Sequence, residues 1–162
     1  MNFPHGDKNN YLSPNALQQT QGSASALWNW LSHGIYGFIV PGTNTFVVIG
    51  SSGGVDSGIG YKITQDNGNL CGGHCSYEAA DNYNYYWLFD VQEILDAAQV
   101  YDIQPYAYGA FSVPFDNQGL NNIIGGTFDP ASGMLYLSLK YAGRVGRHDR
   151  PPLIVGYQVS IP

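Results

Sequence analysis

The sequence is poor in charged residues, and poorest in basic ones. Only 11% of its 162 residues are charged, with 6 basic residues against 12 acidic ones and a net charge of −6. A general nucleic-acid-binding surface needs a basic footprint, so this composition argues against nucleic acid as a partner. Disorder requires high charge and few aromatic residues, whereas this chain is 44% hydrophobic and 14% aromatic. The chain is therefore expected to fold.

Long apolar runs are also missing. No run approaches the ~18 residues of a membrane-spanning helix, so we expect no membrane insertion. Residues 1–22 are polar and show no signal-peptide pattern. The sequence therefore predicts either a protein that stays inside the cell or a mature or truncated form.

Cysteine is scarce, and its two residues lie close together in Cys71-Gly-Gly-His-Cys75. Two thiols and a histidine can bind a metal, but structural zinc needs four ligands and the usual second pair is absent. The two glycines let the chain curl far enough for a disulfide, which is the interpretation we favour. Reduced thiols and a metal site remain the alternatives. We expect neither a metal nor a cofactor.

Glycine and tyrosine, by contrast, are abundant, with 21 and 13 residues. Glycine at this level among aromatic and β-branched residues predicts an all-β fold of short strands and tight turns. One turn is expected at Asp129–Gly133, where Pro130 presets φ. A short helix is expected at Asp90–Ala98, because Asp90 and Glu93 have the spacing of a capping box. Strands are expected at Tyr36–Val40, Thr45–Ile49, Ile59–Thr64, Tyr85–Phe89, Tyr106–Val113, Asn122–Phe128, Met134–Leu139 and Leu153–Ser160.

Two phrases of the sequence are nearly the same. Tyr36–Pro41 reads YGFIVP, and Tyr108–Pro114 reads YGAFSVP. Three weaker matches follow in the same order, which together indicate an internal repeat. These matches are Ile49-Gly50 with Ile124-Gly125, Gly58–Tyr61 with Gly133–Tyr136, and Phe89–Val91 with Tyr157–Val159. We predict two four-stranded antiparallel units, 35–104 and 105–162, each like a β-propeller blade, after an N-terminal arm or clasp at 1–34.

The runs Gly125–Ser138 and Pro151–Val159 resemble the last blade of secreted bacterial β-propellers of uncharacterised function. Thr45–Gly54 and Tyr85–Asp90 look like the blade before it. The resemblance implies an extracellular or periplasmic protein, as a disulfide also does, and it implies no catalytic residues. Closed propellers have about four to eight blades, so we expect copies to complete a ring, for example three chains giving six blades. The alternatives are a piece of a longer protein and a β-sandwich.

An aromatic patch with amide and carboxylate neighbours suggests a ligand surface. Such surfaces suit sugars and protein contacts alike. The candidate ligand-binding residues are Tyr77, Tyr83, Tyr85, Asp81 and Trp28. Four of the six basic residues cluster between Lys140 and Arg150, while most carboxylates precede them. We therefore expect Arg144, Arg147 and Arg150 to contact an acidic neighbour, such as another copy of the chain.

The function that these features favour is a non-catalytic binding or assembly module for carbohydrate or a protein partner. One alternative is a hydrolase that uses loop carboxylates or Ser52, which is central in the G-x-S-x-G run Gly50–Gly54. That run is expected to be a loop between strands and lacks the helix of a nucleophile elbow. A second alternative is a purely structural ring. An exposed aromatic shelf would favour sugar binding, a deep pocket with carboxylates of shifted pKa would favour an enzyme, and a large apolar interface would favour assembly.

Overall fold

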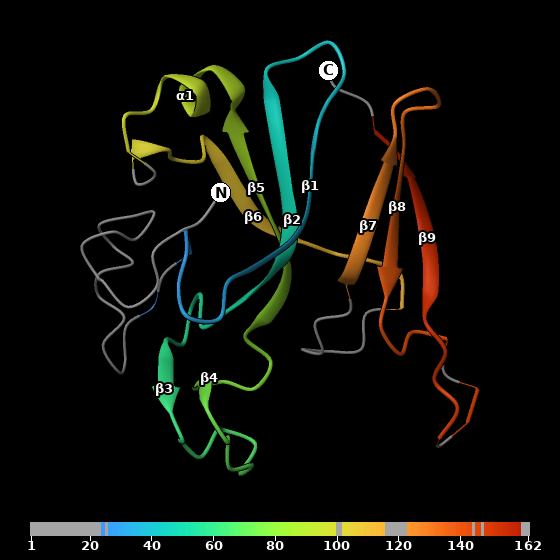
Figure 1. Cartoon of the computed structure of the whole chain (residues 1–162). Coiled ribbons are helices and arrows are strands. Elements are labelled where there is room, and N and C mark those ends of the chain that lie inside the picture. The colour runs from blue at the N-terminus through green and yellow to red at the C-terminus, as the bar shows by residue number, and fades with distance from the viewer. Residues whose placement is uncertain are drawn as a thin grey trace.

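The fold is all-β, as the composition predicts. The computed structural model describes residues 24, 26–99, 102–115, 123–143, 145–146 and 148–159. In this part of the chain the strands form three antiparallel sheets, in the orders β1-β2-β5-β6, β3-β4 and β7-β8-β9 (Figure 1). We call them the first, second and third sheets. The elements are β1 (His33–Ile39), β2 (Thr45–Gly53), β3 (Ile59–Tyr61), β4 (His74–Ser76), β5 (Asn82–Asp90), α1 (Val91–Asp96), β6 (Ala107–Phe111), β7 (Ile123–Asp129), β8 (Met134–Leu139) and β9 (Leu153–Gln158).

The local signals of the sequence produce the expected turns. The Asp90 side chain accepts hydrogen bonds from the backbone N–H groups of Gln92 and Glu93, which confirms the predicted cap of α1. At the β7–β8 turn the Ser132 hydroxyl donates to the Asp129 carboxylate, and this bond in particular lowers the pKa of Asp129. Gly133 takes a φ of 68°, the left-handed conformation that glycine adopts without strain.

The first and third sheets pack against each other, with β1 beside β7 (Figure 1). The rings of Phe38 and Phe128 stack across this boundary with centroids 4.5 Å apart. The backbone N–H of Phe128 donates to the Tyr36 hydroxyl at 2.7 Å. Alternate residues of β8 face inward, as the period of two requires. The resulting first cluster contains Phe38, Val40, Ile49, Val113, Ile123, Leu135, Leu137 and Leu139.

A second cluster covers the other face of the first sheet. Its buried members are Tyr85, Trp87 and Phe89 of β5, together with Ile103. Residues 26–32, which belong to the predicted N-terminal arm or clasp at 1–34, follow this face of their own chain. The Trp87 indole N–H donates to the Leu27 carbonyl at 2.6 Å. The first sheet is therefore packed on both faces along its central strands β2 and β5, whereas Ile39 of the edge strand β1 stays 53% exposed on this side.

The interpretation of the two similar phrases was wrong. They are not one strand of two successive units, because β1 and β6 are the two edges of the same sheet. β6 pairs with β5, from Leu88–Ala107 to Asn84–Phe111, so it belongs with the strands before residue 104. The phrases are alike because each supplies a phenylalanine and a valine to the first cluster, Phe38 and Val40 from one and Phe111 and Val113 from the other.

The assignment of strands to units also needs correction. The predicted strand Ile59–Thr64 is not part of the first sheet; its residues Ile59–Tyr61 form β3, which pairs with β4 in a separate two-stranded sheet. The third sheet has three strands among the described residues, not the four that were expected. The first sheet has four, but its fourth strand is β6.

A different correspondence is present between the β1–β2 and β7–β8 hairpins. Both have the same register and turn length, with Pro41 and Pro130 at the same place in the turn. A β-bulge interrupts both at the same position, between Gly34 and Tyr36 and between Ile123 and Gly125. The corresponding pairs are Ile39–Phe46 with Phe128–Leu135, Phe38–Val47 with Thr127–Tyr136, and Gly37–Val48 with Gly126–Leu137.

The next strands continue this correspondence. Phe89 pairs with Phe46, and Tyr157 pairs with Leu135. Of the four sequence matches, the one between Phe89–Val91 and Tyr157–Val159 therefore relates equivalent strands, β5 and β9. The others relate strands at different places in their sheets.

Tyr157→Phe is expected to raise the free energy of unfolding by about 1 kcal/mol. Within the described residues the Tyr157 hydroxyl is buried without a hydrogen-bond partner, and burial raises its pKa. The substitution removes a hydroxyl whose desolvation is not offset by a hydrogen bond. Phe89 occupies the equivalent position in the first sheet, so a phenylalanine fits there. Urea denaturation measures the change. Tyr85→Phe is the control: it loses a bond to the Ala26 carbonyl and should destabilise the chain. A loss of stability in Tyr157→Phe would show that the Tyr157 hydroxyl makes a stabilising hydrogen bond after all.

Candidate binding surface on the β3–β4 lobe

Residues 54–81 form a lobe that projects from one end of the first sheet (Figure 1). The lobe leaves the sheet after Gly53 and returns at Asn82, which are paired across β2 and β5. The backbone N–H of Gly54 donates to the Asp81 carbonyl at 2.9 Å. Because the two ends of the lobe are adjacent, β2 and β5 stay paired without a register shift as far as the base of the lobe.

Asp81, predicted as a ligand residue, has its carboxylate at the base of the lobe and is only 3% exposed. The carboxylate accepts hydrogen bonds from the backbone N–H groups of Val55, Asp56 and Ser57, at 3.1, 3.1 and 2.7 Å. The Ser57 hydroxyl adds a fourth, at 2.7 Å. Asp81 therefore holds the turn that begins the lobe.

The other predicted ligand residues are divided between the core and the base of the lobe. Tyr85 is 3% exposed, and burial raises its pKa to about 12. Trp28 packs on Trp87 with ring centroids 5.0 Å apart. The Tyr83 hydroxyl points to Asp56 at 3.4 Å, and burial, then the nearby carboxylates, raise its pKa. Tyr77 is half-buried within the lobe. The structure thus does not bring these residues together as one surface.

The predicted disulfide joins Cys71 to Cys75, with Cα atoms 6.4 Å apart. Two backbone hydrogen bonds tie the same tip, from Lys62 N–H to the Gly73 carbonyl at 2.7 Å and from Cys71 N–H to the Ile63 carbonyl at 2.9 Å. Both thiols are used in the disulfide, so neither is available as a metal ligand. Over the described ranges, no three His, Cys, Asp or Glu side chains gather as a metal site.

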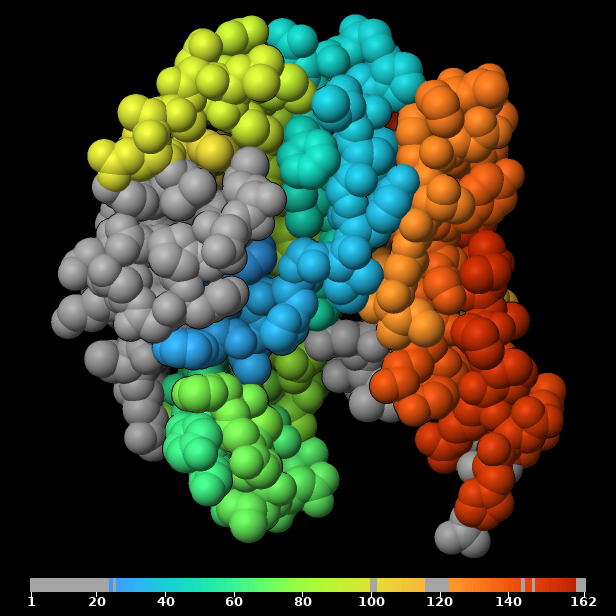
Figure 2. Space-filling model, in the orientation of Figure 1, coloured from blue at the N-terminus to red at the C-terminus, as the bar shows by residue number. Residues whose placement is uncertain are grey.

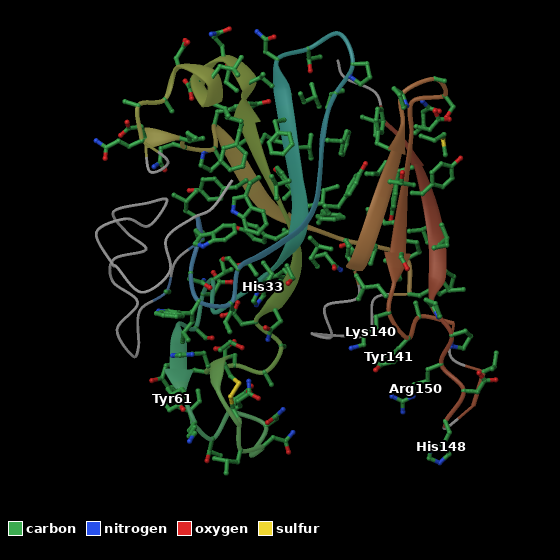
Figure 3. The ribbon with its side chains drawn as sticks, in the orientation of Figure 1. His33, Tyr61, Lys140, Tyr141, His148 and Arg150 are labelled. Carbon is green, nitrogen blue, oxygen red and sulfur yellow. A yellow bond between two sulfur atoms is a disulfide. The ribbon has the colours of Figure 1, made fainter. Side chains whose placement is uncertain are left out.

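The sequence did not predict that the side chains of Trp30, His74 and Tyr61 lie side by side, but in the structure they form an exposed row. Tyr61 of β3 lies directly opposite His74 of β4, with ring centroids 5.0 Å apart. His74 in turn stacks on Trp30, at 5.1 Å and an interplanar angle of 10°. Tyr61 is 54% exposed and Trp30 is 40% exposed. We call Trp30, His74 and Tyr61 the aromatic row; Figure 3 labels Tyr61 at its end.

Buried polar groups hold the turn that carries Trp30. The Asn29 amide donates to the Gly53 carbonyl at 2.8 Å, and its oxygen accepts from the Leu31 N–H at 2.8 Å. The Ser32 hydroxyl lies 2.9 Å from the Ser52 hydroxyl. Trp30 is thereby fixed beside the lobe although it is distant from it in sequence.

This network also places Ser52. The run Gly50–Gly54 was expected to be a loop, but β2 continues through it as far as Gly53. Ser52 is 1% exposed. A nucleophile must reach its substrate, so this geometry does not favour Ser52 as a catalytic serine.

A second projection lies at the same end of the molecule as the lobe. It is the connection between β8 and β9, and Figure 2 shows a notch between it and the lobe. Lys140, Tyr141, His148 and Arg150 lie on it (Figure 3), with the Lys140 ammonium 4.7 Å from the Tyr141 ring centre. Arg150 is exposed, whereas Arg144 and Arg147 lie outside the described residues. The interface expected from these arginines stays a prediction.

Comparison of the chain with protein-family models, curated proteins and solved structures finds no match. The likeness to secreted β-propellers therefore stays a prediction. In the part of the chain that the structure covers, no helix has the length and apolar character needed to cross a membrane.

Proposed function

We propose that this chain is a non-catalytic module that assembles head to tail with copies of itself, each copy contributing two propeller-like blades. The observation that supports this is an exposed apolar face on the third sheet. The first sheet buries the equivalent face against its neighbour within the chain.

The two sheets differ at equivalent positions. Val47 of the first sheet packs into the first cluster, while its counterpart Tyr136 is 37% exposed on the outer face of the third sheet. Ile154 of β9, which pairs with Ser138 on the same face, is 65% exposed. We call the side that includes Tyr136 and Ile154 the outer face. Exposed apolar side chains grouped on one sheet face are typical of an interaction site, and we expect another sheet to dock here.

The first sheet exposes apolar side chains on β1 that could receive this outer face from another copy. Phe128 stacks on Phe38 within the chain, but its counterpart Ile39 is 53% exposed, and nearby Ile35 is 37% exposed. If Ile39 of one copy packs on the outer face of the next, it repeats the contact that Phe128 makes with the first sheet. Head-to-tail contacts that close give rings, and three copies would give six blades.

Charge supports the same arrangement. The β8–β9 connection occupies the place in the third sheet that the lobe occupies in the first, so the two projections would alternate around a ring. The lobe has exposed carboxylates at Asp66 and Glu78 against the cation Lys62, whereas the connection has the cations Lys140 and Arg150 against the carboxylate Asp149. Opposite charges on alternating projections favour the head-to-tail order. The disulfide supports an oxidising compartment, extracellular or periplasmic.

A mixing experiment tests the proposal. Light scattering on a sizing column should give the wild type about three times the 17.6 kDa of one chain. Ile39→Arg and Ile154→Arg each damage one of the two faces, so each variant alone should be monomeric. Mixed together, they retain one intact pair of faces and should form a dimer.

The control is Leu70→Arg, at an exposed leucine of the lobe outside both faces, which should assemble like the wild type. A monomeric wild type would overturn the proposal. So would variants that stay monomeric when mixed, because only a head-to-tail contact is restored by complementary damage.

A further inference from the structure

We infer that the aromatic row binds a linear, neutral polysaccharide. This goes beyond the proposed assembly. Tyr61 and His74 lie on the lobe and Trp30 lies beside it, outside both proposed contact faces. Trp and Tyr usually bury most of their ring surface. Here Trp30 and Tyr61 remain 40% and 54% exposed in a continuous row with His74.

The row is held rigidly before any ligand arrives. Tyr61 and His74 are fixed by the β3–β4 register and by the disulfide next to His74. The buried Asn29 fixes the turn beneath Trp30. Side chains that are already ordered lose little entropy on binding, so such a row suits a ligand that offers only weak contacts at each unit.

The chemistry of the row matches that of pyranose sugars. A sugar ring has apolar C–H groups that pack on aromatic side chains and hydroxyl groups that need polar partners. The side chains of His74 and Lys62 are both exposed: Lys62 can donate hydrogen bonds to hydroxyls, and the His74 ring can donate or accept them. Lys62 is already placed there, with its ammonium 5.2 Å from the Tyr61 ring centre. Trp30 and Tyr61 lie at the two ends of the row with His74 packed between them, so their exposed ring surfaces can contact separate units of one chain.

Charge favours a neutral chain over an acidic one. The protein has a net charge of −6, and the lobe exposes Asp66 and Glu78 against the single cation Lys62. A polymer of uronic acids would be repelled by this field. The same field does not oppose a glycan without carboxylates or sulfates.

Native gels cast with polysaccharide test the inference. The neutral probes are glucomannan, galactomannan and hydroxyethyl cellulose, with polygalacturonate as the acidic comparison. At least one neutral probe should slow the wild type, and Trp30→Ala and Tyr61→Ala should each weaken the affinity ~10-fold. Tyr61→Phe keeps the ring and should bind like the wild type. Tyr106→Ala, which removes a 57% exposed tyrosine away from the row, is the matched control.

A fluorescence measurement separates binding from misfolding. Trp87 is fully buried and Trp28 is half-buried, so acrylamide quenching reports mainly on Trp30. The retarding polymer should protect the wild type from quenching. Trp30→Phe keeps a ring in the row, so it should stay retarded while the protection disappears.

Three results would overturn the inference. They are no retardation of the wild type by any neutral probe, alanine variants that run like the wild type, and stronger retardation by polygalacturonate. Ile39→Arg keeps the row, so its retardation by a neutral probe shows sugar binding even if assembly fails.

Discussion

Phe38→Ala is expected to lower the free energy of unfolding by about 3–5 kcal/mol. Phe38 is buried between the first and third sheets, where it stacks on Phe128 at 4.5 Å and on Tyr36 at 5.9 Å. Its truncation leaves a cavity where the two sheets meet. Urea denaturation should show the loss, measured in the Ile154→Arg background so that assembly does not contribute.

The neighbouring residue provides the control. Ile39 points to the opposite face of β1 and is 53% exposed. Ile39→Ala in the same background should cost less than about 1 kcal/mol. Equal losses in the two variants would show that Phe38 does not join the sheets.

Asp81→Ala is the second large effect, with an expected loss of about 3–5 kcal/mol. The substitution leaves the N–H groups of Val55, Asp56 and Ser57 without their acceptor at the base of the lobe. Asp81→Asn keeps one acceptor oxygen and should lose less. Thermal unfolding followed by circular dichroism measures both variants.

Glu78→Ala removes an exposed carboxylate of the same lobe and should change stability by less than about 0.5 kcal/mol. If Asp81→Ala melts at the wild-type temperature, the carboxylate does not hold the turn. The variant should also lose the order of the aromatic row, because the lobe carries Tyr61 and His74.

Local features of the fold were predictable, because they depend on residues close in sequence. The Asp90 cap, the turn at Pro130 and the Cys71–Cys75 bond are all of this kind. Strand partners were not predictable. An alternating pattern shows that a strand has a buried face, but not which core that face enters. Phe38 and Phe111 looked like one position repeated because they enter the same cluster from opposite edges of a sheet.

The aromatic row could not be predicted for a related reason. Tyr61 and His74 meet because β3 pairs with β4. To predict this contact one must first locate β4, which is only three residues long. Trp30 joins them through the buried amide of Asn29, a contact that no local pattern shows. The structure divides the predicted patch because Tyr85 lies on a central strand, where large aromatic residues face the core, and Trp28 packs against the same cluster.

The closed base of the lobe makes it a unit that can change without the sheet. Gly53 pairs with Asn82 at the base of the lobe, and the Asp81 carboxylate fixes the turn that begins it. Insertions and replacements between residues 58 and 80 are therefore expected to leave the β2–β5 register intact. The molecule thus separates a sheet frame from an exchangeable tip, so a lobe with other exposed aromatic residues could be grafted onto the same frame.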